Sequence, residues 1–97
     1  MPIFLLFGTY TPEALEGISA GRTKKAIKLI EKHGGEVKSM YAVLGEHDLV
    51  FTVTFPDAEN AMTASLALRK LTGISFTTSP VVDVEEFDKL VGEVKDV

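Results

Sequence analysis

The residues best suited to chemistry lie in one short stretch, Gly45-Glu46-His47-Asp48. A histidine beside a carboxylate is a common pairing for proton transfer near neutral pH. His47 and Asp48 are therefore the candidates for a catalytic pair, and Glu46 is a third polar side chain that could contact a ligand. The same stretch is also typical of a turn, in which Gly45 adopts a positive φ, Asp48 caps the backbone, and the other two side chains are solvated.

Three more residues are candidates for ligand binding: Arg22, Tyr10 and Tyr41. Arg22 follows Gly21 at the entry of a predicted helix, where a guanidinium and free backbone N–H groups could together hold a carboxylate or a phosphate. The two tyrosines lie on or beside predicted strands and could line a pocket with their hydroxyls inward. Each residue also has a structural explanation, a surface ion pair for Arg22 and core packing for the tyrosines.

The sequence offers little support for a metal or a cofactor. It contains two histidines, His33 and His47, and no cysteine. They flank opposite ends of a predicted strand, which at roughly 3.3 Å per residue places them about 25 Å apart. No Gly-rich phosphate loop, nucleophile elbow or Ser-His-Asp order is present, which argues against hydrolases, kinases and nucleotide-binding proteins. We therefore expect neither a metal nor a cofactor.

The composition limits the classes of protein to which this chain can belong. Hydrophobic residues make up 45% and charged residues 25% of the 97 residues, which is typical of one globular domain spanning residues 1–97. The net charge of −4 argues against nucleic-acid binding, which requires clustered cations. The absence of cysteine fits a reducing cytoplasm, and the apolar run at residues 3–7 is too short to span a membrane. We expect a cytoplasmic protein with no membrane or nucleic-acid partner.

The elements that must position these residues follow from hydrophobic periodicity and from capping residues. Four strands are predicted at residues 2–10, 36–44, 49–55 and 74–82, and Pro80 places the last one at an edge of the sheet. The first strand is apolar at odd and even positions, as in a strand covered on both faces. Helices are predicted to start at Thr11-Pro12-Glu13, to run from Arg22 to Gly34, to run from Asp57 to Gly73, and to follow Asp83.

This order, β-α-β-β-α-β with a short C-terminal helix, predicts an α+β, ferredoxin-like fold with a four-stranded antiparallel sheet. Both long helices then cover one face of the sheet. Their apolar sides are expected at Ala26, Leu29, Ile30 and His33 in the first, and at Ala58, Ala61, Met62, Ser65, Leu68 and Leu71 in the second. The opposite face keeps apolar side chains, so we expect a homodimer with its sheets face to face, or a higher oligomer.

The residues also resemble a known family, the GYD domain family, across nearly the whole chain. The matching positions are Thr11-Pro12-Glu13, Arg22, Gly34-Gly35, Tyr41, Gly45-Glu46-His47-Asp48, Phe55-Pro56-Asp57 and Glu85-Glu86-Phe87. His47 stands where the family's hairpin motif usually has tyrosine. The resemblance implies a dimeric α+β barrel like those of small cofactor-independent monooxygenases and of the effector-binding domains of leucine-responsive regulators.

Two functions follow as hypotheses. The first is a small dimer that binds a small molecule in a pocket or at the subunit seam. The second is a cofactor-independent monooxygenase or isomerase, in which His47 and Asp48 move a proton and Arg22 or Tyr41 stabilises developing negative charge. The two differ in geometry, because catalysis requires these four residues to border one cavity.

Overall fold

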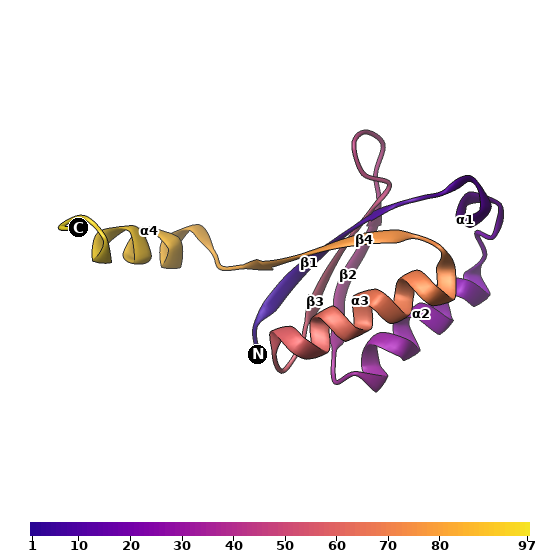
Figure 1. The fold of residues 1–97 in the computed structure, drawn as a ribbon, viewed down its shortest axis with the longest axis horizontal. Helices are drawn as coiled ribbons and strands as arrows, with labels where there is room; N and C mark the ends of the chain where they lie inside the picture. Colours follow the sequence, from indigo (N-terminus) through magenta and orange to yellow (C-terminus); the bar gives the residue numbers. More distant parts are fainter.

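The structure is a computed structural model that describes residues 1–97. Its strands are β1 (Ile3–Thr9), β2 (Glu36–Ala42), β3 (Leu49–Thr54) and β4 (Ser75–Val81), and its helices are α1 (Pro12–Glu16), α2 (Ala20–Lys32), α3 (Ala58–Thr72) and α4 (Val84–Glu93). The strands form one antiparallel sheet in the order β2-β3-β1-β4, and α2 and α3 lie on one face of it (Figure 1). The predicted ferredoxin-like fold is confirmed, with β4 at an edge.

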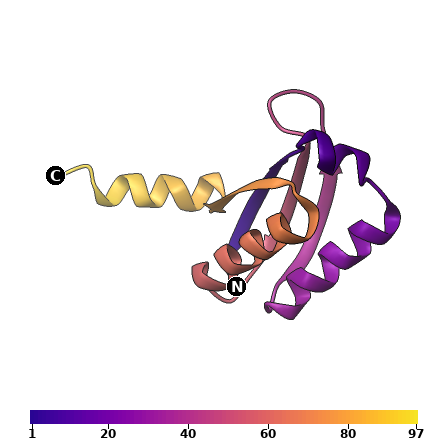
Figure 2. The same ribbon diagram turned by 45° about the vertical axis from the view of Figure 1, so that its right-hand side comes forward.

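The core lies between the sheet and the two long helices, which Figure 2 shows from a second side. Successive residues of a strand point to opposite faces, so β1 sends Phe4 and Leu6 into the core. They meet Phe51 and Val53 of β3, their partners in the sheet register. Ala26 and Ile30 of α2, two of the positions predicted for its apolar side, complete the core from above.

The opposite face of the sheet, called the open face below, carries no helix. It includes Ile3, Leu5 and Phe7 of β1, of which the last two pair with Thr52 and Val50 of β3. Leu5 and Phe7 are half-buried and Ile3 is exposed. A single chain therefore covers the first strand on one face, because both long helices cross to the same side, and coverage of its other face stays a prediction.

The segment before α2 contains a helix boundary that periodicity did not indicate. The Thr11 hydroxyl accepts the N–H of Ala14 and caps α1, which ends at Gly17 after five residues. The Ser19 hydroxyl then accepts the N–H of Arg22 and caps α2, so that helix begins at Ala20 rather than at Arg22. Serine is one of the preferred N-cap residues, and the stability that this cap adds allows the helix to include Gly21 in its first turn.

The buried side of α3 is rotated from the predicted one. Ala61 and Leu68 are buried as expected, but Met62 and Leu71 are exposed, and Ala58 is exposed at the first turn. Ala64 and Thr72 are buried instead, which gives a stripe at a spacing of three to four residues. The small side chains of Ala61 and Ala64 allow the helix to lie close to the sheet and α2, and this close approach decides the rotation.

Strand β2 ends earlier than predicted, at Ala42, and a longer loop follows. The N–H of Val43 donates to the carbonyl of Asp48 at 2.8 Å, which closes the hairpin around Leu44 to His47. Strands β2 and β3 are antiparallel neighbours, as expected.

Helix α4 continues the line of β4 and leads away from the rest of the chain (Figure 1). Its predicted N-cap is confirmed, since the Asp83 carboxylate accepts the N–H of Glu86 at 2.8 Å. None of its residues is buried. The extension lengthens the molecule to 52 Å, against 30 and 19 Å in the other two directions. No helix is long and apolar enough to cross a membrane.

Candidate functional site

A cavity of about 180 Å³ lies on the helical side of the sheet, at the end where α2 begins. Its walls come from the segment between β1 and α2, from α2 itself, from all of the strands but β1, and from the end of α3 with the residues that follow it. Ten of its 14 lining residues are hydrophobic, namely Tyr10, Ile18, Ala26, Met40, Tyr41, Ala42, Leu49, Phe51, Ile74 and Phe76, and the other four are Ser19, Arg22, Thr23 and Thr72. An apolar hollow with few polar groups is the usual form of a small-molecule site.

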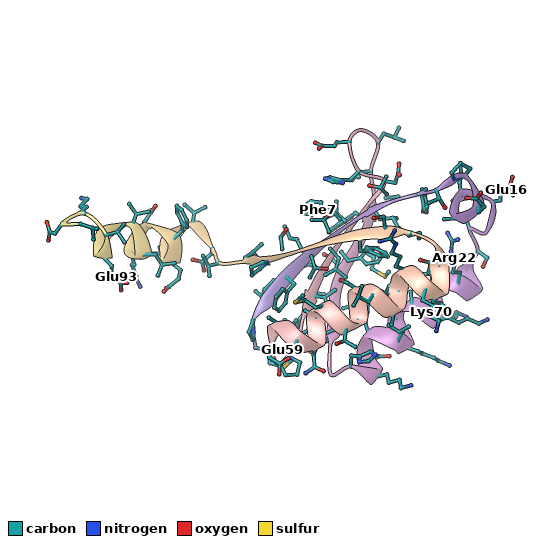
Figure 3. All side chains as sticks on the ribbon, in the orientation of Figure 1. Phe7, Glu16, Arg22, Glu59, Lys70 and Glu93 are labelled. Atoms are coloured by element: carbon teal, nitrogen blue, oxygen red, sulfur yellow. The ribbon has the colours of Figure 1, made fainter.

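Arg22 is the one charged residue that lines this cavity. Its Nη1 donates to the carbonyl of Ala14 at the end of α1, and its guanidinium carbon lies 5.9 Å from the centre of the Tyr10 ring. Figure 3 labels Arg22 at this end of the molecule, on the helical side of the sheet. The ion pair considered for Arg22 does not form, because the structure contains a single ion pair, between Lys38 and Glu36 at 3.0 Å.

The position of the guanidinium depends on local backbone features. At the break between α1 and α2, the carbonyl of Ala14 accepts both the N–H of Gly17 and Arg22 Nη1, since carbonyls at a helix C-terminus lack their full set of intrahelical donors. Gly17 leaves room beside it, since a Cβ at this position would lie 2.8 Å from Arg22 Nη1. A guanidinium has five N–H donors, so Arg22 keeps most of its hydrogen-bonding capacity for another group.

The two tyrosines contribute differently to this cavity. Tyr10 is half-buried and its ring faces Arg22. Tyr41 lines the cavity from β2, but it is 63% exposed and its register partner is Val50 of the open face. The core packing considered for the tyrosines therefore does not describe Tyr41.

Asp48 connects the hairpin loop to the end of β1. Its Oδ2 accepts the N–H of Tyr10 at 2.8 Å, and its own N–H donates to the carbonyl of Gly8 at 2.8 Å. The carboxylate thus caps the chain that follows β1 rather than its own turn. Gly45 has φ of 142°, so the positive φ expected from the turn is confirmed. Asp48 also borders a second, shallower hollow with Tyr10, Thr11, Pro12 and Leu15.

His47 turns toward the open face instead of toward Asp48. Its ring packs on Phe7, with ring centroids 4.8 Å apart at 35°, and Figure 3 labels Phe7 near the base of the hairpin loop. Its Nδ1 is buried without a hydrogen-bond partner, and no hydrogen bond joins it to Asp48. Glu46 is exposed, and neither Glu46 nor His47 lines the cavity that contains Arg22. The structure thus brings together Tyr10, Arg22 and Tyr41 on one cavity, joins Asp48 to the backbone of Tyr10, and leaves Glu46 and His47 apart from them.

The apolar walls of the cavity were not identified as site residues from the sequence. Met40, Phe51 and Phe76 show the same alternation as residues that only fill a core. No signal in the sequence separates these two roles. The chain has no group of three or more His, Asp or Glu residues that could hold a metal ion.

Comparisons with known proteins agree with this architecture. No curated protein matches the chain. Among solved structures, the leucine response regulatory protein of Mycobacterium tuberculosis matches with a TM-score of 0.57 and 17% identity over 86% of this chain. The chain corresponds to 51% of that protein, about half its length, and at this identity the likeness shows the fold alone. The model of the GYD domain matches residues 4–91, and the chain therefore belongs to the GYD domain family.

Proposed function

We propose that this chain is a ligand-binding domain whose cavity holds a small molecule with an apolar body and one anionic group. The observation that carries this proposal is Arg22, a cation without a carboxylate partner on the wall of a mainly hydrophobic cavity. A partly desolvated guanidinium binds a carboxylate through charge-assisted hydrogen bonds, often two in parallel. Tyr10 lies beside Arg22 on the same wall, with its ring toward the guanidinium.

The size of the cavity limits the ligand. At about 180 Å³ it is smaller than the roughly 300 to 1,000 Å³ of typical drug-sized sites. A molecule of amino-acid size is therefore the class we expect. The protein with the similar fold is named as a leucine response regulator, which makes leucine and its close analogues the first probes to use.

Binding is tested by following the thermal unfolding of the full chain with three probes: leucine, 4-methylpentanoate and 4-methylpentan-1-ol. The last two differ in whether the carbon chain ends in a carboxylate. A ligand at 100 times its Kd stabilises a protein by about 2.7 kcal/mol, which raises Tm by several degrees in a domain of this size. We expect such a rise with at least one carboxylate and none with the alcohol.

The role of Arg22 is tested by Arg22→Met, which keeps an apolar stem and removes the charge. Lys25→Met on the same helix is the control, because Lys25 is exposed and does not line the cavity. We expect the first variant to lose carboxylate binding and the control to keep it. Equal binding of the carboxylate by Arg22→Met, or equal binding of the alcohol by the unmodified chain, would contradict the proposal.

We also propose that the chain forms a homodimer through its open face. Leu5, Phe7 and Val50 supply apolar surface there that no helix covers. A 97-residue chain buries only about 60 to 65% of its unfolded surface, so covering this face adds needed stability. Extension of the assembly beyond a dimer and location in the cytoplasm stay predictions from the sequence.

The hypothesis of a cofactor-independent monooxygenase or isomerase receives no support from the geometry. The Asp48 carboxylate is occupied by the N–H of Tyr10, and the His47 ring packs on Phe7. Proton transfer between a base and its partner requires hydrogen-bond reach, which this pair does not show.

A further inference from the structure

Helix α4 carries an apolar stripe that nothing in its own chain covers. At 100° per residue, Val84, Phe87, Leu90, Val91 and Val94 fall within about one third of the helix circumference. All five are exposed, with exposed fractions of 75% for Val84 and 56% for Phe87. In Figure 3 the helix, marked by Glu93, stands apart from the side chains of the rest of the chain.

A helix of this kind requires a partner to persist in water. It has ten residues, and isolated helices shorter than about 12 to 15 residues are marginally stable even with favourable sequences. Most helical stability in proteins comes from packing an amphipathic face against another element. The stripe on α4 is such a face, so its position in the fold indicates a docking element.

Its own chain does not supply the partner. Only Val82 and Asp83 separate the end of β4 from the start of α4. Asp83 is extended, and the helix continues in the direction of the strand (Figure 1). The surface that covers the stripe therefore belongs to another molecule.

The distribution of charge indicates which surface that is. Residues 83–97 contain six carboxylates and two lysines, a net charge of −4, whereas residues 1–82 contain eight of each sign and are neutral. Two copies of α4 would therefore repel one another. Helices α2 and α3 together carry seven cationic side chains and two carboxylates, a net charge of +5. Their cations are unpaired in the chain, because the single ion pair involves Lys38 and Glu36.

The same two helices also present apolar surface. Met62 and Leu66 lie one turn apart on α3 and are 62% and 69% exposed. Lys70, one turn further on, is exposed beside them. An acidic helix with an apolar stripe fits this combination of exposed apolar and basic side chains in both respects.

We propose that α4 docks on the helical layer, formed by α2 and α3, of a second copy of this chain. When two copies exchange their C-terminal helices in this way, each stripe is covered and the interface is closed by two-fold symmetry. The proposal does not depend on a ligand in the cavity, and it concerns a different surface from the open face.

The contact is tested by photo-cross-linking in the full chain, with p-benzoylphenylalanine in place of Phe87. This chain is mixed with an excess of unmodified chain labelled with ¹⁵N, unfolded and refolded together, and irradiated. Mass spectrometry then distinguishes cross-links within one chain from those between light and heavy chains. The matched control carries the probe at Lys89, which lies about 200° around the helix from Phe87.

We expect the probe at position 87 to cross-link α4 of the light chain to α2 or α3 peptides of the heavy chain, and the probe at position 89 to give about tenfold less product. Cross-links confined to one chain, cross-links to other surfaces of the heavy chain, or none at all would each overturn the proposal.

A substitution provides a second measurement that leaves the body of the fold intact. Val91→Asp places a carboxylate within the stripe, and Gly92→Asp places the same charge outside it, where a new Cβ meets no atom within 4 Å. With the probe at position 87, we expect Val91→Asp to lower the cross-linking yield about tenfold and Gly92→Asp to have little effect. Equal yields from the two variants would overturn the proposal.

Discussion

Two of the polar residues considered for a functional site, Asp48 and Arg22, form hydrogen bonds with the backbone. Asp48 accepts the N–H of Tyr10, and Arg22 donates to the carbonyl of Ala14, so both link segments that are separate in sequence. Arg22 nevertheless keeps free donors and a place on the cavity wall, whereas the Asp48 carboxylate acts as a cap. Arg22 can therefore bind a ligand because it has N–H donors left over, whereas the Asp48 carboxylate already has a backbone partner.

A structural role for Asp48 predicts a loss of stability. Asp48→Ala leaves the part-buried N–H of Tyr10 without its acceptor, so we expect the free energy of unfolding to fall by about 1 to 2 kcal/mol. Asp48→Asn keeps an acceptor oxygen and should lose less. Urea denaturation measures both, with Glu46→Ala as the control because Glu46 is exposed. A fall no greater than that of the control would contradict this role.

Gly35 lies just after α2, where the chain packs against the core, and a larger side chain at this position should destabilise the fold. A Cβ there would lie 2.6 Å from Phe55 Cε1 and 2.7 Å from Ile30 Cγ2, both in fully buried side chains. We expect Gly35→Ala to destabilise the fold by about 1 to 3 kcal/mol through overpacking. Gly92→Ala is the matched control in the same denaturation experiment, since no atom surrounds that position and alanine favours a helix. Similar midpoints for the two variants would exclude overpacking.

The helices and strands are set mainly by local signals at their ends. All four helices have a hydroxyl or carboxylate cap, namely Thr11, Ser19, Asp57 and Asp83. The sequence indicates three of these caps, because a proline or an acidic residue follows them. It does not indicate Ser19, since Gly17 and Gly21 on either side interrupt the helical pattern. Rotation of α3 could not be found locally either, because it depends on how closely the helix approaches its neighbours.

The N-cap of α3 should contribute measurably to the stability of the fold. The Asp57 carboxylate accepts the N–H of Asn60 at 2.8 Å, so Asp57→Ala should cost about 1 kcal/mol. Asp57→Asn should remain close to the unmodified protein, because asparagine is an equally good N-cap. Thermal unfolding followed by circular dichroism compares the two. Equal losses in both variants would assign the effect to the charge rather than to the cap.

The whole molecule leaves the open face and the stripe of α4 uncovered, in addition to Met62 and Leu66 on α3. We propose that the open face pairs with the open face of another copy, and that the stripe of α4 covers the helical layer of another copy. Both proposals explain why a small chain with a packed core keeps large hydrophobic side chains exposed at these positions.

If the chain dimerises through the open face, a charged side chain on that face should weaken the dimer. Phe7→Asp puts a carboxylate on that face, so we expect the dimer dissociation constant to rise at least about tenfold. Leu15→Asp is the control, because Leu15 is exposed and lies on α1, outside the sheet. Sedimentation at several concentrations measures both variants, with circular dichroism to verify folding. An unmodified chain that stays monomeric at micromolar concentration would refute the dimer.

The sequence by itself determined the fold class, the order of the elements, most of their boundaries and the family, because these depend on periodicity, caps and turns within a few residues of one another. It also indicated Arg22, Tyr10 and Tyr41 as ligand-binding candidates, but without their relation in space. The grouping of these three on one cavity, the turn of His47 toward Phe7, and the exposure of α4 emerged only from the three-dimensional arrangement. Such features depend on which surfaces are brought together by packing over long separations in sequence, and neither residue type nor local spacing contains that information.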